Sequence, residues 1–265
     1  MLRNYARNKM NEFENLISLL ESPNKENFSL GLVVAQNYKK EILEYFGCEL
    51  EEIEELAEFL MKNNVWKQTG AVFEIEELDL DGINLTELPK SVCLLKYLTH
   101  LSLANNQLQS LPKEIINLKY LDGLCLNFNQ LQNIPSEVYK ITSLKMLNLE
   151  SNQLQDISPE IGNLPKLERL YLSYNQLQNI PREIENLKEL LLLQLDNNAL
   201  ESIPSEISKL SKLEYLCLED NQLQNIPLII SDIRSLKWLT LANNKISPKN
   251  LSKIKKSFKH SYVER

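Results

Sequence analysis

The chain has 265 residues, a formal net charge of -7 and ordinary apolar content, at 43%. This acidic balance disfavours nucleic acid or an anionic membrane as the partner, because both require a cationic footprint. No apolar run reaches the roughly 18 residues that a membrane-spanning helix needs, and the polar N-terminus lacks the apolar core of a secretory signal. The length allows one large domain or two.

The four cysteines, Cys48, Cys93, Cys125 and Cys217, form no close pair along the sequence. We interpret them as reduced thiols, which are typical of a reducing compartment. Together with the missing signal, they predict a cytoplasmic protein. A non-classical secretion route is compatible with the same observations.

Residues 1–70 do not follow the pattern found later in the chain and are predicted to be helical. Apolar residues recur at helical spacing, Ser22-Pro23 resembles an N-cap followed by proline, and Gly47 is a natural helix stop. The predicted helices cover residues 13–20, 24–36, 39–46 and 49–62. We expect this region to cap the domain that follows; the alternative is a separate recognition module.

A 23-residue unit governs the chain from residue 71 to residue 246. Its reference copy, residues 98–120, reads LTHLSLANNQLQSLPKEIINLKY. Further copies open at leucines 121, 144, 167, 190 and 213, an incomplete copy opens at 236, and an irregular copy precedes them from Ile75. A fixed period of this length indicates a solenoid.

The pattern LxxLxLxxNxLxxLPxxIxxL resembles the leucine-rich repeat family, in the subclass found in intracellular Ras-associated scaffolds and many bacterial proteins. The resemblance implies an α/β fold: a right-handed horseshoe of about eight coils with a parallel sheet on its concave side. It does not by itself define a biochemical task.

Within each copy, positions 1, 4 and 6 are apolar and alternate with polar positions, which predicts a half-buried strand. Position 9 is asparagine from Asn106 onward, and we expect its carboxamide to bond the backbone of neighbouring coils. The first coil has Ile83 there, so its bend should differ. The prolines of the second half favour extended or 3₁₀ segments, and Ser158-Pro159 predicts a local displacement in the fourth copy.

Residues 247–265 are predicted to form a C-terminal cap. Ser247-Pro248 resembles a helix start, and the sequence HSYVE is expected to add a short strand. Three apolar residues of this helix are positioned to cover the last coil: Leu251, Ile254 and Phe258.

Converging catalytic groups are scarce, and we predict no catalytic, cofactor or metal site. The rival hypothesis is a hydrolase or metal-dependent enzyme that uses Glu77, Asp79, Asp81 and His100, with Ser102 nearby. Same-face neighbours along a strand lie about 7 Å apart, which is too wide for three carboxylates to ligate one ion without help.

The concave face is the predicted binding surface. Aromatic and apolar residues gather on its middle and C-terminal coils with acids around them, as in a protein interface. We therefore predict a protein or peptide partner with basic and apolar groups. The alternative is that the aromatics are strand formers only; an effector-type secreted protein and carbohydrate binding are further options. The predicted contact residues are Phe128, Met146, Glu150, Arg169, Tyr171, Tyr174, Leu192, Asp196, Tyr215, Glu219 and Trp238.

Overall fold

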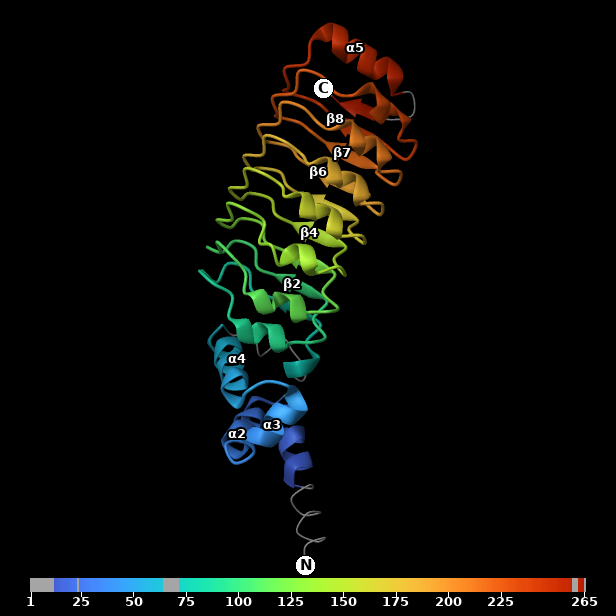
Figure 1. Cartoon of the computed structure of the whole chain (residues 1–265). Coiled ribbons are helices and arrows are strands. Elements are labelled where there is room, and N and C mark those ends of the chain that lie inside the picture. Colours follow the sequence, from blue (N-terminus) through green and yellow to red (C-terminus); the bar gives the residue numbers. More distant parts are fainter. Residues whose placement is uncertain (1–11, 23, 64–71, 259–261, 265) are drawn as a thin grey trace, which may run out of the picture.

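The computed structural model describes residues 12–22, 24–63, 72–258 and 262–264. Figure 1 shows them as one elongated stack, with the N-terminal helices at one end and helix α5 (Pro248–Ser257) at the other. The predicted solenoid with an N-terminal helical region is confirmed.

The described strands form a nine-stranded parallel sheet in sequence order. Each strand pairs with the next at identical repeat positions, as in Leu124 opposite Leu147, so each turn of the chain advances by one strand. The strands are β1 (Glu77–Asp79), β2 (His100–Ser102), β3 (Gly123–Cys125), β4 (Met146–Asn148), β5 (Arg169–Tyr171), β6 (Leu192–Gln194), β7 (Tyr215–Cys217), β8 (Trp238–Thr240) and β9 (Tyr262–Glu264).

The core is a continuous column of leucines and isoleucines between the sheet and the return segments. Leu98, Leu101 and Leu103 are at most 1% exposed, and their equivalents in later coils stack on them. The cluster runs from Leu16 in the N-terminal helices to Phe258 after the last helix. Each coil therefore depends on its neighbours to bury its apolar side.

The return segments are short 3₁₀ helices, as predicted. They are η2 (Val72–Glu74), η3 (Lys90–Leu94), η4 (Lys113–Asn117), η5 (Val138–Lys140), η6 (Pro159–Asn163), η7 (Arg182–Asn186), η8 (Ser205–Lys209) and η9 (Leu228–Asp232). The displacement predicted for the fourth copy is wrong, because η6 begins at the same repeat position as η4 and η7. Ser158 (φ -62°, ψ 145°) adopts the extended conformation that Pro112 has in the reference copy (φ -65°, ψ 144°).

The asparagines at position 9 form the predicted ladder. Asn152, for example, donates from Nδ2 to the carbonyls of Leu126 (2.9 Å) and Leu149 (3.1 Å) and accepts from the Leu131 N–H at 3.0 Å. One side chain thus joins its own coil to the preceding one. The first coil differs as expected: it has two left-handed residues, Gly82 (φ 66°) and Asn84 (φ 59°), around its bend.

The N-terminal helices match their predicted positions. Residues 12–20 are helical, followed by α2 (Lys25–Ala35), α3 (Lys39–Phe46) and α4 (Leu50–Lys62). Gly47 ends α3 in a left-handed conformation, φ 70°. The predicted N-cap of α2 at Ser22 is wrong. The N-cap is Asn24, whose side-chain oxygen accepts from the N–H groups of Glu26 (2.8 Å) and Asn27 (3.0 Å).

These helices contact the first coil directly. Helix α4 packs on η3, and Lys90 Nζ lies 2.9 Å from Glu52 Oε1. The rings of Phe46 and Phe73 are 4.7 Å apart between centroids. The helices therefore cover the open end of the leucine column; the division of the chain into domains stays a prediction.

The C-terminal end is closed as expected from Ser247-Pro248. The Ser247 hydroxyl accepts from the Asn250 N–H (3.3 Å) at the start of α5, and Ile254 and Phe258 are buried against the last coil. Strand β9 then pairs with β8. No helix in the described ranges has the length and apolar character to cross a bilayer.

Candidate binding surface on the sheet

The side chains at repeat positions 3, 5, 7 and 8 point away from the leucine core, and we call their surface the sheet face. At position 3, five predicted contact residues stand on five successive strands, from β4 to β8, each in register with the next. They are Met146, Arg169, Leu192, Tyr215 and Trp238. The structure therefore brings them into one row, with neighbours about 4.8 Å apart.

A second row at position 5 runs beside the first. Tyr171 lies two residues along β5 from Arg169 and pairs with Asn148 and Gln194 on its two sides. Its side chain is half-buried, so part of it packs against neighbouring side chains and part is accessible to a partner.

Phe128 and Tyr174 stand at position 8, just beyond the strands, where the backbone is left-handed. Their φ values are 55° and 56°, and their side chains are 53% and 55% exposed. Other coils place asparagine at this position, as at Asn105, Asn197 and Asn243. Asparagine tolerates the left-handed region, whereas a bulky residue there costs about 1–2 kcal/mol.

This geometry decides against the strand-former explanation for these two residues. Neither lies in a strand, since β3 ends at Cys125 and β5 at Tyr171. Neither supports the core, since both rings are exposed. Both aromatic residues thus occupy left-handed backbone positions and contribute to neither a strand nor the core.

Three acidic residues of the prediction lie at position 7 along the edge of the same surface: Glu150, Asp196 and Glu219. The Asp196 carboxylate accepts from the Glu219 N–H (2.9 Å), from Ser173 Oγ (3.4 Å) and from Thr240 Oγ1 (3.4 Å). Desolvation by burial outweighs these bonds and raises the pKa of Asp196 above its usual value.

The edge of the sheet face is acidic. Among the residues that the structure describes, no lysine or arginine forms an ion pair with Glu150, Asp196 or Asp220. Arg169, the cation of the sheet face, is directed to Glu168, with 3.9 Å between Nη1 and Oε2. The carboxylates of Glu150, Asp196 and Asp220 therefore present negative charge to a cationic partner.

Trp238, the last predicted contact residue in the position 3 row, packs against a further aromatic residue. Its ring packs on Tyr262 of β9 with 4.3 Å between centroids, and it is only 38% exposed. Part of its aromatic surface therefore serves the C-terminal end of the sheet. Tyr262 extends the row and was missed in the sequence, because β9 lies beyond the last copy, at a spacing of 24 rather than 23 residues from Trp238.

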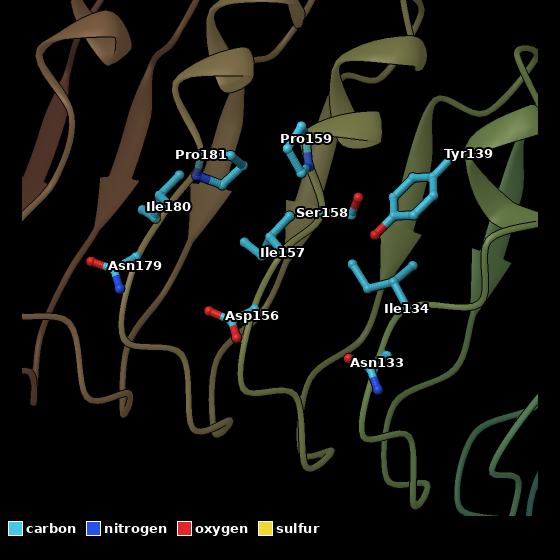
Figure 2. A pocket seen from close by; sticks show the side chains of 10 residues that line it. All are labelled: Asn133, Ile134, Tyr139, Asp156, Ile157, Ser158, Pro159, Asn179, Ile180 and Pro181. Atoms are coloured by element: carbon cyan, nitrogen blue, oxygen red, sulfur yellow. The ribbon is translucent and has the colours of Figure 1, made fainter.

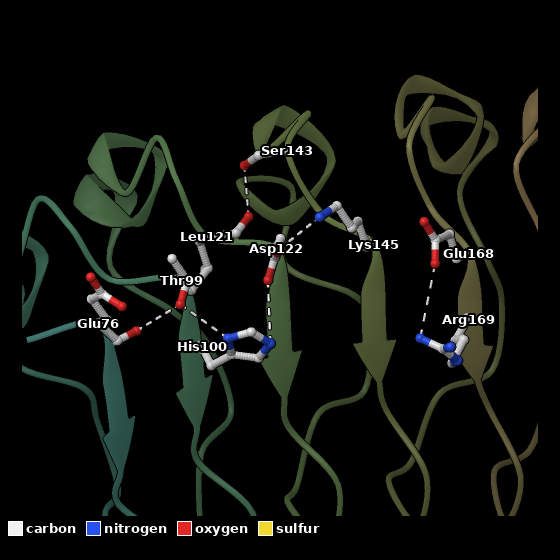
Figure 3. Close-up of polar contacts among 9 residues, drawn as sticks. All are labelled: Glu76, Thr99, His100, Leu121, Asp122, Ser143, Lys145, Glu168 and Arg169. Atoms are coloured by element: carbon white, nitrogen blue, oxygen red, sulfur yellow. Dashed lines mark hydrogen bonds and ion pairs between the residues drawn. The ribbon is translucent and has the colours of Figure 1, made fainter.

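The residues of the enzyme hypothesis are bonded elsewhere, as Figure 3 shows for His100. Its Nε2 lies 3.3 Å from Asp122 Oδ1, and its Nδ1 lies 3.0 Å from Thr99 Oγ1. Ser102 Oγ donates to Asp81 Oδ1 at 2.6 Å. His100 and Ser102 therefore take different carboxylates, and the arrangement lacks the serine–histidine hydrogen bond of a nucleophile and its base.

Gly123 explains the position of the His100 ring. A Cβ at residue 123 would lie 2.4 Å from His100 Cδ2, so the missing side chain lets the imidazole lean across β3 toward Asp122. Lys145 shares this carboxylate, with 3.0 Å from Nζ to Oδ2. The result is a cross-strand ion-pair network on the surface.

The acids proposed as metal ligands are also engaged with the backbone. Asp79 Oδ1 accepts from the Asp81 N–H (2.9 Å), and Asp81 Oδ1 accepts from the Ala104 N–H (2.7 Å). In the described part of the chain, no three His, Cys, Asp or Glu side chains are grouped to hold a metal ion.

A groove of about 400 Å³ lies on the return segments, away from the sheet face (Figure 2). Ile134, Ile157 and Ile180 line it from three successive coils, with Tyr139 at one end. Burial raises the pKa of Tyr139 to about 12, so its phenol stays protonated and acts as packing. None of the predicted contact residues lines this groove.

The comparisons with known proteins agree with this architecture. The family model described as "Leucine-rich repeat region" matches residues 49–179 and 156–256. A solved leucine-rich repeat protein of Leptospira interrogans is 37% identical, with a TM-score of 0.61 over 72% of this chain and 54% of that chain. This chain thus spans about half the length of that protein.

Two further solved structures are similar over most of this chain. Internalin C2 of Listeria monocytogenes is 24% identical, with a TM-score of 0.62 over 74% of this chain and 84% of that one. At this identity the similarity concerns the fold only. The plant peptide hormone receptor RGFR1 in complex with RGF2 is 30% identical, with a TM-score of 0.57 over 67% of this chain and 30% of that one. No curated protein matches the chain.

Proposed function

Because the chain belongs to the leucine-rich repeat family, we propose that it is a non-catalytic interaction module that binds a partner protein or peptide on its sheet face. The observation that carries the proposal is the pair Phe128 and Tyr174. Both expose aromatic rings from left-handed backbone positions where the coils around them have Asn105, Ser151 and Asn197. A binding surface accounts for side chains that the fold itself would not select.

The chemistry of the partner follows from what surrounds these rings. The row from Met146 to Tyr215 offers apolar contact area. The carboxylates of Glu150 and Asp196 offer negative charge, and no lysine or arginine of the described residues pairs with them. We infer that the partner presents lysine or arginine next to apolar side chains. A cation between Tyr174 and the acids would gain both a charge contact and a cation–π contact.

One similar structure supports a peptide as the form of that partner. The receptor RGFR1 was solved in complex with RGF2. A preformed parallel sheet is well suited to this task, because a rigid surface loses little entropy on binding.

The direct test compares capture by the wild-type chain with capture by a triple variant, Tyr174→Ala/Leu192→Ala/Tyr215→Ala. These three side chains stand on neighbouring coils of the sheet face, and Trp238 is left intact because it packs on Tyr262. Partners are captured from native cells, identified by mass spectrometry, and their affinities measured with purified protein. We expect the triple variant to bind at least about 30-fold more weakly, as for loss of an interface hot spot.

The matched control is Tyr120→Ala, which removes a tyrosine that is 60% exposed and lies off the sheet face. It should bind as wild type does. Equal binding by the triple variant and wild type would show that the partner uses another surface.

We further propose that the protein works in a reducing compartment such as the cytoplasm. None of its four cysteines is paired with another in the structure, and burial raises the pKa of Cys48 to about 11 and that of Cys93 to about 12. Such thiols stay protonated at neutral pH and have no role that requires oxidation. Rapid alkylation in native cells, followed by mass spectrometry, should find all four thiols reduced; oxidised cysteines would contradict this location.

A further inference from the structure

A cavity of about 240 Å³ lies at the junction of the N-terminal helices and the first coil. Its floor is apolar and comes from two segments: Phe46 and Cys48 at the end of α3, and Phe73 in η2. The two phenylalanine rings touch, with centroids 4.7 Å apart. Because burial raises the pKa of Cys48 to about 11, its thiol is neutral and behaves as part of the apolar floor.

Two tyrosines form the mouth of this cavity. Tyr45, from α3, is 54% exposed, and Tyr97, from the first coil, is 56% exposed. The Tyr45 ring meets Phe46 edge-on, with centroids 4.9 Å apart and planes at 77°. A planar ring that entered between Tyr45 and Tyr97 would therefore meet aromatic surfaces on several sides, in the geometries that aromatic pairs favour.

The polar groups at the mouth are one carboxylate and one ammonium group. Glu21 accepts a long hydrogen bond from Tyr45 Oη, at 3.4 Å, and no second hydrogen bond from a side chain that the structure describes, so its oxygens have capacity for another donor. Lys96 Nζ donates to the Phe46 carbonyl at 2.9 Å, which holds its charge at the C-terminal end of α3. A cationic ligand would meet this ammonium group and is disfavoured, whereas a neutral ring with a donor suits Glu21.

We propose that this cavity binds an aromatic ring that carries an N–H or O–H donor, of the indole or phenol type. The size agrees, because an apolar cavity of roughly 150 Å³ accommodates benzene, and 240 Å³ accommodates a bicyclic ring. The ring would fill the floor and direct its donor to Glu21. The site is separate from the sheet face and does not depend on the proposed function.

The same ring chemistry has two sources: a free small molecule or a tryptophan or tyrosine side chain of a partner. The experiment titrates free indole and N-acetyl-tryptophanamide separately into the full chain labelled with ¹³C in its leucine methyl groups. Leu94 lines the cavity, so its methyl signals report on occupancy. Saturable shifts at Leu94 are expected with at least one probe. Binding of indole alone assigns a small molecule, and binding of the capped tryptophan assigns a partner side chain.

Three variants test the contacts. Tyr97→Ala removes one exposed wall, and should weaken binding about three- to tenfold. Glu21→Ala should abolish the preference for indole over N-methylindole, which lacks the donor. Tyr215→Ala, on the sheet face, should bind the probes as wild type does, so a failure of the sheet-face proposal would leave this result untouched.

The inference is overturned if neither probe gives saturable shifts at Leu94, or if Tyr97→Ala binds as tightly as wild type. An unchanged preference for indole in Glu21→Ala would overturn the role of the donor. Both substituted residues are exposed, so the variants are expected to fold; the unperturbed methyl spectrum of each variant confirms this before titration.

Discussion

At the scale of single residues, Tyr174 occupies a backbone conformation that is unfavourable for its residue type. Its left-handed backbone, φ 56°, is the conformation that Asn197 adopts at the same position one coil later, φ 55°. An asparagine can bond its own backbone there, whereas a tyrosine only loses conformational freedom. We regard this as stability exchanged for a binding surface.

The substitution Tyr174→Asn should therefore raise the free energy of unfolding by about 0.5–1 kcal/mol, by relieving part of the left-handed cost. Urea denaturation measures the change. The control Tyr215→Asn, in a strand with ordinary backbone, should give no stabilisation. If Tyr174→Asn destabilises the protein, the ring contributes to the fold, and this would contradict the hypothesis that Tyr174 serves binding alone.

Asp196 is a second residue with an energetic cost: its burial disfavours the charged form of its carboxyl group. Desolvation raises its pKa in the folded protein above the ordinary value of 3.8. In the pH window between these two values the folded state binds the proton more tightly than the unfolded state, so stability falls as pH rises through the window. Above it, the carboxylate remains a constant cost to the fold.

Asp196→Asn should accordingly be more stable than wild type at pH 7, and the difference should fall with pH and vanish below about pH 3, where the carboxyl is protonated in both states. Thermal melts at a series of pH values provide the measurement. Asp220→Asn is a control on the next coil for which no stability gain is expected. A stability difference that persisted unchanged at pH 3 would show that the substitution acts through packing instead.

At the scale of elements, the asparagine ladder holds successive coils together. Asn152 is 8% exposed, and its removal would leave the N–H of Leu131 without its acceptor. The carbonyls of Leu126 and Leu149 would each lose one of two donors and keep those of Asn129 and Asn175. Buried backbone groups without partners cost about 1–3 kcal/mol each. The ladder therefore stabilises the bends as much as the leucines stabilise the core.

We predict that Asn152→Ala lowers the free energy of unfolding by about 1–3 kcal/mol. Asn152→Asp should also be destabilising, because a carboxylate accepts from Leu131 but cannot donate to the two carbonyls. Chemical denaturation compares both with Gln153→Ala, an exposed neighbour expected to change stability by less than about 0.5 kcal/mol. A loss in Asn152→Ala no larger than in this control would mean that water replaces the carboxamide.

At the scale of the whole molecule, the N-terminal helices and the solenoid share one apolar cluster. Helix α4 buries Leu50, Ile53 and Leu56 and packs on η3 of the first coil. We propose that the region acts mainly as a cap, because an open solenoid end would expose a slice of its core. The acids of α4 fit this role, since Glu51 and Glu52 pair with Lys39 and Lys90.

A chain that begins at residue 72 should therefore melt at a lower temperature than the full chain and bind a dye for exposed apolar surface. Calorimetry and dye fluorescence measure the two effects, and a chain that begins at residue 12 is the control. A truncated chain that kept the melting temperature of the full chain and stayed monomeric would identify residues 12–62 as an independent module.

The sequence by itself determined the repeating part of the molecule. Each coil contacts the coils next to it at equal positions, so a 23-residue period specifies the strands, the leucine column, the ladder of Asn152 and its equivalents, and the 3₁₀ returns. Helix ends that carry local signals, such as Gly47 and Ser247, could also be predicted from the sequence. Local contacts repeated along the chain leave few alternatives.

Only the tertiary structure decided the features in which neighbouring coils differ. The sequence did not reveal that Tyr174 is held in a left-handed conformation, that Asp196 is desolvated by burial, or that His100 contacts Asp122. The cavity beside Phe46 was equally invisible, because it depends on how non-repeating helices dock on the first coil. These outcomes depend on side-chain packing between segments without a common period, which no local pattern encodes.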